Sequence, residues 1–463
     1  MSLTQPVDIV VVGGGHAALC AAISAAERGR RVVLLERAPK LMRGGNTRHT
    51  RNFRTLHEAP IAGLQDSYSA DEFWQDLHRV TQGRTNVELA QLTIRNSASL
   101  LHWLLDHGVH FQPSLSGTLS LSRTNAFFLG GGCALTNQLY SVAEKLGVEV
   151  HYDCRVVGVE LQGNECRQVT AIMGDETHTI EADGFIMACG GFQANQSWMR
   201  KVWGSAADNF LIRGTPFNEG DVLEALMAQG VATTGDPTQC HAVAIDARAP
   251  KFDGGIVSRL DCVPFGIVVN ATGQRFYDEG EDFWPKRYAI WGRLIATQTQ
   301  QIAYAIIDSK VTHNFMPSVY PPLAADTLND LAAQLDLPAA ALNETVKQYN
   351  EAVVPGSFDP QTLDDCRTEG LQPDKTHWAL KIDTPPFYAY PLRPGITFTY
   401  LSVVVDAQAR VQMHNGQSCT NLFAAGEIMA GNILGQGYCA GTGMTIGGVF
   451  GRIAGEQAAC PSN

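Results

Sequence analysis

Residues 8–36 constrain the fold more than any other part of the chain, because they have the pattern of a nucleotide-binding βαβ unit. An apolar run at 8–12 predicts a buried parallel strand, and a helix of small residues is expected over 17–29. A second apolar strand follows at 31–35 and ends at an acid, Glu36. The order of strand, helix, strand and acid makes this unit far more specific than its glycine motif alone.

The glycine motif inside the unit indicates what it would bind. Gly13, Gly15 and Ala18 fit the pattern G-x-G-x-x-A. Gly13 permits the tight turn, Gly15 lets a pyrophosphate reach the helix N-terminus, and Ala18 keeps helix and strand close. Glu36 suits a pair of ribose hydroxyls and would repel a 2′-phosphate, which disfavours NADP. The alternative is a tight turn that binds no ligand.

The composition is that of a large globular protein with an acidic balance of charge. The 463 residues suffice for about two or three domains. With 34 Lys and Arg against 46 Asp and Glu, the net charge of −12 argues against nucleic acids and anionic membranes as partners. The eleven cysteines form no CxxC pair, which argues against disulfides and metal sites and fits a reducing cytoplasm. Neither a signal peptide nor a membrane-spanning segment is expected.

A basic loop follows the nucleotide-binding unit. Residues 43–54 hold four arginines and a histidine but no acid, although the chain as a whole is acidic. One interpretation is an exposed basic loop. Its position directly after the nucleotide unit favours another, in which the loop forms a polar wall near the cofactor or an anionic substrate.

The remaining pattern predicts a nucleotide-binding fold that is interrupted by a second domain. Helices are expected at 70–80, 86–107 and 130–146, strands of a small antiparallel insertion at 148–153, 156–161 and 169–173, and a buried strand at 181–191. From 240 to 394 the alternation of buried strands and helices typical of a nucleotide-binding fold is lost, which indicates an inserted domain that covers the substrate. It returns with a strand at 421–427, a glycine-rich loop at 431–438 and a helix at 441–455. The expected division is therefore 1–239 and 395–463 for the cofactor and 240–394 for the cap.

Five motifs in their order along the chain resemble the flavoproteins of the fumarate reductase and succinate dehydrogenase superfamily. They are the first glycine turn, Gly44-Gly45-Asn46-Thr47, Ala188-Cys189-Gly190-Gly191, Asn218-Glu219-Gly220-Asp221 and Ala425-Gly426-Glu427. The resemblance implies an α/β fold, in which a Rossmann-like FAD-binding domain carries an inserted α+β substrate-capping domain. It also implies FAD as the cofactor.

The same resemblance implies where FAD lies. Its adenosine is expected at Glu36, its ribitol near Gly426 and Glu427, and its isoalloxazine beside residues 44–47, while the amides of the helix from Gly441 would stabilise the reduced ring. Thr47 stands where membrane succinate dehydrogenases have the histidine that binds FAD covalently, with His49 two residues on, so non-covalent FAD is expected. The full set of expected FAD residues is Gly13, Gly15, His16, Ala17, Ala18, Glu36, Arg37, Gly44, Gly45, Asn46, Thr47, Ala188, Gly190, Asp221, Gly426, Glu427, Gly441, Thr442 and Gly443.

Within that superfamily, the runs 43–52, 123–128, 275–287 and 393–400 are similar to those of tricarballylate dehydrogenases. This similarity implies oxidation of a CH–CH bond in a small polycarboxylate, tricarballylate to cis-aconitate, with hydride loss to flavin N5 and proton removal by a cap residue. A flavoprotein of a corrinoid (cobalamin precursor) pathway and a fumarate reductase-like enzyme are the alternatives. A flavin-bearing electron carrier with no small substrate represents a different class.

Arginines are the expected substrate ligands, because planar guanidinium groups bind carboxylates with two parallel hydrogen bonds. His241 matches the histidine at the start of the family's cap, with a structural histidine as the alternative. Soluble fumarate reductases have a histidine near 399–400 and an arginine near 433–436, and both are missing here, so fumarate itself is a poor fit. The expected substrate residues are Arg48, Arg51, Arg123, His241, Arg393 and Tyr400.

The expected catalytic residues, Arg287, Glu279 and Tyr288, follow from the family's proton acceptor, an arginine after an R-F-x-x-E element in the cap. That element runs from Arg275 to Glu279, and the matching arginine is Arg287, after a short insertion relative to fumarate reductases. A pKa above ~12 puts its neutral form roughly 7 kcal/mol uphill at neutral pH. A relay through Glu279 or Asp282 would reduce this cost, and Tyr288 or Lys286 could accept the proton instead. Alternatively, Arg287 only binds a carboxylate.

The route by which electrons leave the protein is the last expectation. No second nicotinamide-binding βαβ unit and no iron–sulfur cysteine spacing follow Glu36. Electrons are therefore expected to pass to another protein, and the resemblance implies a membrane-bound iron–sulfur or haem partner. The chain is expected to be cytoplasmic, to reach the membrane only through this partner, and to hold no metal.

Overall fold

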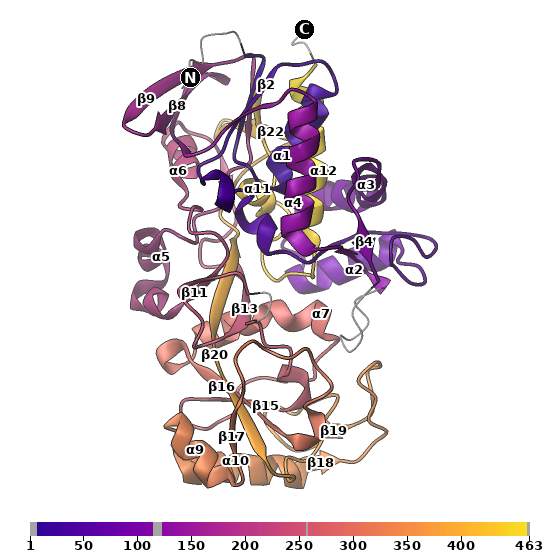
Figure 1. Ribbon diagram of the computed structural model, residues 1–463. Helices are drawn as coiled ribbons and strands as arrows, with labels where there is room; N and C mark the ends of the chain where they lie inside the picture. Colours follow the sequence, from indigo (N-terminus) through magenta and orange to yellow (C-terminus); the bar gives the residue numbers. More distant parts are fainter. Residues whose placement is uncertain (1–6, 114–122, 256–257, 461–463) are drawn as a thin grey trace.

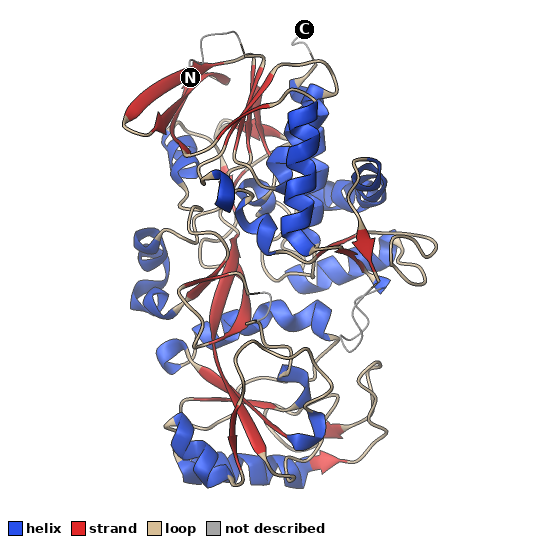
Figure 2. Ribbon diagram, in the orientation of Figure 1, coloured by secondary structure: helices blue, strands red, loops and turns tan. Residues whose placement is uncertain are grey.

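The computed structural model describes residues 7–113, 123–255 and 258–460, which form an upper and a lower region in Figure 1. The upper region contains the described parts nearest to both chain ends, and the middle of the chain forms the lower region. Sheets and helices occur in both regions (Figure 2). The α/β fold class expected from the sequence is confirmed.

A six-stranded sheet in the order β22-β23-β10-β1-β2-β6 forms the centre of the upper region. The five strands from β23 to β6 pair in parallel, and β22 is antiparallel at the edge. Both neighbours of β1 are apolar, and all four residues of β1 are buried, which is typical of a parallel strand covered on both faces. The strands are β1 (Ile9–Val12), β2 (Val32–Leu35), β6 (Glu149–His151), β10 (Gly184–Met187), β22 (Arg410–Gln412) and β23 (Ser418–Ala424).

Helices α1 and α12 pack against this sheet and against each other (Figure 1). Their contact is unusually close, because a Cβ added at Gly451 or Gly455 would overlap the carbonyl oxygens of Ala17 and Ala21. The backbones of α1 and α12, the first and last described α-helices, are therefore in direct contact. The helices of this region are α1 (His16–Ala26), α2 (Ala70–Thr81), α3 (Val87–Asp106), α4 (Gly131–Lys145), α11 (Glu427–Ala430) and α12 (Thr442–Ala458).

A three-stranded antiparallel sheet, β7 (Cys154–Gln162), β8 (Glu165–Met173) and β9 (Glu176–Glu181), lies beside β23. The expectation for residues 148–153 was wrong, since β6 is not part of this insertion but pairs in parallel with β2. The alternation of apolar residues does not show with which neighbouring strand a three-residue strand pairs. The third strand of the insertion is instead β9, whose mostly exposed, polar residues gave no apolar signal.

The lower region is built on a seven-stranded sheet in which β20 is the central, 13-residue strand. Apolar residues under this sheet form a core separate from that of the upper region, closed by α9 and α10 at the end far from the upper region (Figure 1). The strands are β11 (Leu211–Arg213), β13 (Cys240–Asp246), β14 (Phe252–Asp253), β15 (Ile267–Asn270), β16 (Ala303–Asp308), β17 (Leu323–Ala325) and β20 (Phe387–Thr399). The main helices are α7 (Trp284–Arg287), α8 (Trp291–Ala296), α9 (Leu328–Leu335) and α10 (Ala339–Ala352).

The lower sheet extends past the expected limits of 240 and 394 on both sides. It includes β11, and β20 continues to Thr399. Pro391 and Pro394 lie within β20, where prolines would usually indicate a loop. The remaining elements are β3 (Asn52–Arg54), β4 (Phe111–Gln112), β5 (Asn125–Phe128), α5 (Gln196–Trp203), α6 (Asp221–Ala228), β12 (Thr233–Thr234), β18 (Val353–Val354), β19 (Arg367–Thr368) and β21 (Ser402–Val403), with short 3₁₀ turns between them.

None of the helices in the described ranges combines the length and the apolar character that a membrane crossing requires.

Candidate active site

A cavity runs from the upper sheet to the lower region. Residues at the carboxyl ends of β1, β2 and β10 line one end, and Arg259 and Tyr288 line the other. The carboxyl edge of a parallel sheet is where open α/β folds bind ligands. The cavity is thus divided between a nucleotide end and an end within the lower region.

The glycine turn after β1 forms the floor of the nucleotide end. Gly13 has a φ of 109°, and an added Cβ there would overlap the Ala188 carbonyl group. Gly15 precedes α1 and, as a glycine, has no side chain to cap this helix. Both glycines line the cavity. The positive end of α1 therefore faces the open cavity, as a pyrophosphate site requires.

Glu36 is a buried carboxyl group at the same end of the cavity. One of its oxygens accepts a hydrogen bond from the Ala38 amide at 2.7 Å. Burial raises its pKa to about 7, and the backbone amides and the charge of Arg37 oppose this rise only in part. Arg37 is not free to neutralise it, because it forms ion pairs with Glu219 and Asp221. The hydroxyls of a ribose would supply the hydrogen bonds that Glu36 lacks.

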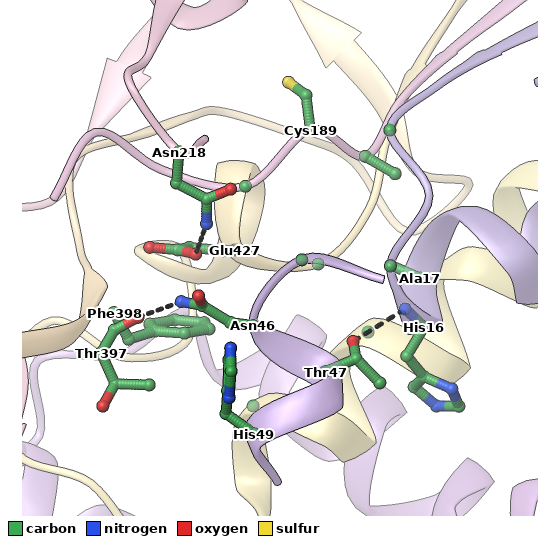
Figure 3. A pocket seen from close by; sticks show the side chains of 18 of the residues that line it. His16, Ala17, Asn46, Thr47, His49, Cys189, Asn218, Thr397, Phe398 and Glu427 are labelled. Carbon is green, nitrogen blue, oxygen red and sulfur yellow. Dashed lines mark hydrogen bonds between the residues drawn. The ribbon is translucent and has the colours of Figure 1, made fainter. Parts of the chain in front are cut away.

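The loop at 44–47 connects the nucleotide end to β20 (Figure 3). Thr47 Oγ1 accepts a hydrogen bond from the His16 amide at 2.9 Å. Asn46 Nδ2 donates to the Thr397 carbonyl oxygen at 2.6 Å, and Asn46 Oδ1 accepts from the Thr215 amide at 2.8 Å. The loop that is expected to lie beside the isoalloxazine ring is therefore held from three sides.

Glu427 is a second buried carboxyl group in the cavity wall. It accepts hydrogen bonds from the Thr399 amide at 2.9 Å and from Asn218 Nδ2 at 3.3 Å, the latter drawn in Figure 3. Burial raises its pKa to about 7, although hydrogen bonds from Thr399 and Gln193 oppose this effect. Glu427 thus joins β20, the segment before α6 and the start of α11.

The N-terminus of α12 also faces the cavity. Gly441, with a φ of 80°, precedes this helix and has no side chain to cap it. The Gly443 amide donates to the hydroxyl of Tyr438 at 2.9 Å. Two helix N-termini that follow glycines, a glycine turn and a buried carboxyl group therefore meet in one cavity, and this combination fits FAD, whose pyrophosphate, ribose and flavin carbonyls are the matching partners.

Three arginines surround the other end of the cavity: Arg51, Arg213 and Arg259. Arg259 forms a two-fold ion pair with Asp261, with both N–O distances at 2.8 Å. Arg213 donates only to neutral oxygens, those of Gly255 and Thr397 at 3.2 and 3.1 Å and that of His49 at 3.4 Å. Burial and the repulsion of Arg259 lower the pKa of Arg51 to about 9. This end of the cavity therefore carries an excess of positive charge.

His241 lies among these arginines, between two tyrosine rings. Its ring stacks on Tyr438 with centroids 3.8 Å apart and meets the edge of Tyr288 at 5.7 Å. Neither ring nitrogen has a hydrogen-bond partner among the described residues. Burial, with the charges of Arg213 and Arg259, holds its pKa far below the ordinary value. His241 is thus neutral and can both donate and accept a hydrogen bond.

Most of the residues expected at the cofactor line this cavity. They are Gly13, Gly15, His16, Ala17, Glu36, Arg37, Gly45, Asn46, Thr47, Ala188, Gly190, Asp221, Gly426, Glu427, Gly441 and Gly443. The other three, Ala18, Gly44 and Thr442, are neighbours in the chain of lining residues but do not line it themselves. Of the expected substrate residues, Arg51 and His241 line the cavity, and of the expected catalytic residues Tyr288 does.

The expected proton acceptor Arg287 does not line the cavity. Its guanidinium group forms an ion pair with Glu281 at 2.6 Å and donates to the Tyr277 hydroxyl at 2.9 Å. Glu279 is also outside, buried in an ion pair with Arg275 at 2.6 Å. The structure therefore separates both residues from the cavity, because each is held by a partner of opposite charge within the lower region.

Four expected substrate residues also lie outside the cavity. Arg123 is paired with Glu72 on α2. Arg48 and Arg393 donate to backbone carbonyl oxygens at 3.0 and 2.9 Å. The Tyr400 hydroxyl donates to a backbone carbonyl at 2.6 Å and is buried. The sequence shows where arginines are concentrated, but it does not show which of them face the cavity, as Arg51 does, and which point elsewhere.

Several lining residues were missed by sequence reasoning. Arg213, Arg259 and Tyr438 come from segments that are far apart in the chain, and no spacing connects them. Phe398 directly precedes the residues at 399–400 where a family histidine was sought. Asn218 belongs to a motif that carried the resemblance, and its position in that motif could have indicated it.

The fold resembles that of solved flavoenzymes. The open conformation of a flavocytochrome c3 fumarate reductase superposes with a TM-score of 0.74 at 22% identity, covering 98% of this chain and 78% of that one.

Among relatives of established activity, NADH:acrylate oxidoreductase from Vibrio harveyi is 26% identical over 99% of this chain and 51% of its own length. NADH:fumarate oxidoreductase from Klebsiella pneumoniae (strain 342) is 26% identical over 98% of this chain and 47% of its own length. The chain therefore spans about half the length of these two relatives.

A family comparison covers nearly all of the described residues. The match extends over residues 8–446, from the residue before β1 into α12. It confirms FAD as the cofactor that the sequence indicated. The chain belongs to the FAD binding domain family.

Proposed function

We propose that the protein is an FAD-dependent oxidoreductase acting on a carbon–carbon bond of a small polycarboxylate, with tricarballylate to cis-aconitate as the first reaction to test. The observation that carries this proposal is the excess of guanidinium groups at the lower end of the cavity. Fumarate and acrylate, named for two relatives, are likewise small unsaturated carboxylates. Bound FAD would supply the two-electron chemistry.

The charges around the cavity favour an anionic substrate. Asp261 neutralises Arg259, but Arg51 and Arg213 form no ion pair with a carboxylate among the described residues. A cation in a poorly solvated site without an anion is costly, and a carboxylate with a planar fork of hydrogen bonds would offset that cost. Two such arginines suit a substrate with at least two carboxylates.

His241 would orient the substrate between these arginines. Both of its ring nitrogens are buried without partners. A buried polar group in this state costs free energy unless a ligand satisfies it. As a neutral imidazole, His241 would bind a carboxylate or hydroxyl oxygen of the substrate through one nitrogen, while Tyr438 and Tyr288 fix the plane of the ring.

Tyr288 replaces Arg287 in our assignment of the proton acceptor. It lines the cavity, whereas Arg287 does not. Burial raises the pKa of its phenol, while Arg259, Arg213 and Arg51 act in the opposite direction and stabilise a phenolate. The phenolate of Tyr288 would take a proton from the carbon beside a carboxylate during oxidation, and the hydroxyl so formed would return this proton during reduction.

The electron partner and the form of FAD are also proposals. Thr47 lines the cavity at the position of the linking histidine and cannot form that bond, which supports non-covalent FAD. We infer a redox partner, membrane-bound and carrying an iron–sulfur cluster or haem, because the sequence after Glu36 has no second nucleotide-binding pattern. The protein would then work in the cytoplasm and meet the membrane through this partner.

Anaerobic spectroscopy tests the proposal. The purified, FAD-loaded protein should lose its flavin absorbance when mixed with tricarballylate, and cis-aconitate should form in equal amount. Dye-reduced protein mixed with cis-aconitate or fumarate checks the reverse reaction and the fumarate reductase-like alternative. Flavin that stays oxidised with every di- and tricarboxylate would contradict the proposal and favour an electron carrier.

A further inference from the structure

A buried cluster of charged groups lies behind the cavity wall without lining it. Asp76 on α2 accepts hydrogen bonds from Lys286 Nζ at 2.7 Å, from the Tyr68 hydroxyl at 2.8 Å and from Arg54 Nη1 at 3.2 Å. Burial alone would raise the pKa of Asp76, but the charges of Arg54 and Lys286 prevail and hold it below its ordinary value. We call these four residues the Asp76 cluster. It is ionised, and Asp76 is its one anion.

The first set of connections leads from the cluster to the wall formed by residues 438–441. Arg54 Nε donates to the Ala440 carbonyl oxygen at 3.0 Å, and the Cys439 thiol contacts the Asp76 carbonyl oxygen at 3.5 Å. Tyr438 and Gly441, on either side of these residues, line the cavity. The cluster therefore fixes the backbone that carries Tyr438 and leads into α12.

The second connection leads into the lower region. Lys286 lies on α7, two residues before Tyr288, so its bond to Asp76 ties α7 to α2 in the upper region. Tyr438 and Tyr288 are also the two rings that contact His241. Both sets of connections from Asp76 thus end at the aromatic rings that hold His241.

We propose that Asp76 is a positioning residue: it sets the relative position of Tyr438 and Tyr288, and through them the orientation of His241 and of the Tyr288 hydroxyl in the cavity. Two cations on different elements, Arg54 on β3 and Lys286 on α7, hold the Asp76 carboxylate, and removal of Lys286 leaves the pair with Arg54 but deletes the bond to α7. The kinetic part of this inference rests on the proposed function, whereas the structural part does not.

The contact between α2 and the segment of α7 also offers a matched control. Arg79, on the next turn of α2, forms an ion pair with Asp282, which precedes α7. This pair crosses between the same two elements, but the Arg79 side chain is 51% exposed, whereas that of Lys286 is 19% exposed. The Asp282 side chain is only 6% exposed, so the control variant has to keep a hydrogen-bond donor for it. Arg79→Gln keeps such a donor in its side-chain amide, and it removes the charge of a crossing ion pair while leaving the three hydrogen bonds to Asp76 in place.

Amide hydrogen exchange of the FAD-loaded protein tests the structural part. In Lys286→Met, exchange in both 284–290 and 437–441 should accelerate by about tenfold or more. Lys286→Arg should restore most of the protection, and Arg79→Gln should leave both segments as in the wild type. The inference is refuted if 437–441 is unaffected in Lys286→Met, or if Arg79→Gln accelerates exchange equally.

Kinetics with a reacting carboxylate test the positioning role. Lys286→Met should lower kcat by about tenfold or more while the substrate Kd changes by less than about threefold, and Lys286→Arg should recover kcat. Wild-type kcat in Lys286→Met, or a loss explained entirely by lower FAD content, would overturn the role. If no carboxylate reacts with the wild type, the proposed function fails, and the exchange experiment still decides the structural part.

Discussion

Replacing Arg51 by methionine should make the protein more stable and, at the same time, weaken its binding of carboxylates. Arg51 lines the cavity, contacts Met316 Sδ at 3.4 Å and forms no ion pair with a carboxylate among the described residues. Burial and repulsion by nearby arginines lower its pKa to about 9. Methionine keeps an unbranched side chain and removes the charge.

The lowered pKa gives the size of the effect on stability, and the lost hydrogen bond gives that of the effect on binding. A decrease from the ordinary value above ~12 to about 9 makes the charged form roughly 4–5 kcal/mol less favourable than in water, at ~1.4 kcal/mol per unit. Solvent in the cavity screens part of this cost, so we expect a gain in unfolding free energy of about 1–3 kcal/mol. Loss of a charge-assisted hydrogen bond should weaken carboxylate binding by ~1.5–3 kcal/mol, or roughly 10- to 150-fold.

Thermal unfolding of the FAD-loaded protein, with and without tricarballylate, measures both effects. Arg51→Met should have a higher Tm than the wild type without ligand and a smaller rise in Tm when the ligand is added. Arg48→Met is the control, because Arg48 is on the same loop but donates to a backbone carbonyl outside the cavity. A lower Tm in Arg51→Met together with unchanged ligand binding would refute our assignment of Arg51.

Three further predictions concern the cofactor and the proton. Gly13→Ala should abolish FAD retention, because φ is 109° and the new Cβ would overlap the Ala188 carbonyl group. Gly29→Ala is the control: no atom lies within 4 Å of its new Cβ, so it should cost only about 1 kcal/mol of stability and keep FAD. Flavin absorbance after gel filtration measures both outcomes. The raised pKa of Glu36, about 7, means that this group lowers the stability of the cofactor-free protein by roughly 3 kcal/mol as pH rises from the ordinary pKa of ~4.3 to 7, while FAD binding tightens. Urea unfolding and FAD titration across this range should show both trends. Glu36→Gln should reduce the loss of stability by about this amount, and the loss that remains is expected from Glu427, whose pKa is also about 7. Tyr288→Phe should lower kcat by about 10²- to 10⁴-fold with little change in substrate Kd, and wild-type kcat would exclude Tyr288 as the proton acceptor.

The nucleotide half of the fold could be predicted from the sequence because its signals are local. The strand of β1, the glycine turn and α1 follow one another within 19 residues, from Asp8 to Ala26, and each has its own periodicity or turn chemistry. The position of β6 could not be predicted, since three residues fit either a parallel or an antiparallel neighbour. β20 was obscured by Pro391 and Pro394, which the sheet accommodates.

The substrate end of the cavity was less accessible to sequence reasoning because its charge balance depends on long-range pairing. Arg51 and Arg123 look alike in the sequence, but Glu72 neutralises only Arg123. Arg213 is the last residue of β11, whereas Arg259 lies between β14 and β15, and both line the cavity. Glycine turns are recognised by local spacing, whereas the direction in which an arginine points is set by the rest of the fold.

The close contact between α1 and α12 has a consequence for the synthesis of the protein. Helix α1 carries the first glycine turn, yet its face is completed only by Gly451 and Gly455 of α12. Likewise, β1 pairs with β10, and β10 with β23, so the central sheet also requires the last part of the chain. During synthesis, the apolar surface of α1 and β1 is therefore expected to stay exposed until the last part of the chain is available, and such a surface is a binding site for chaperones. We expect FAD to be held stably only after residue 455 has left the ribosome.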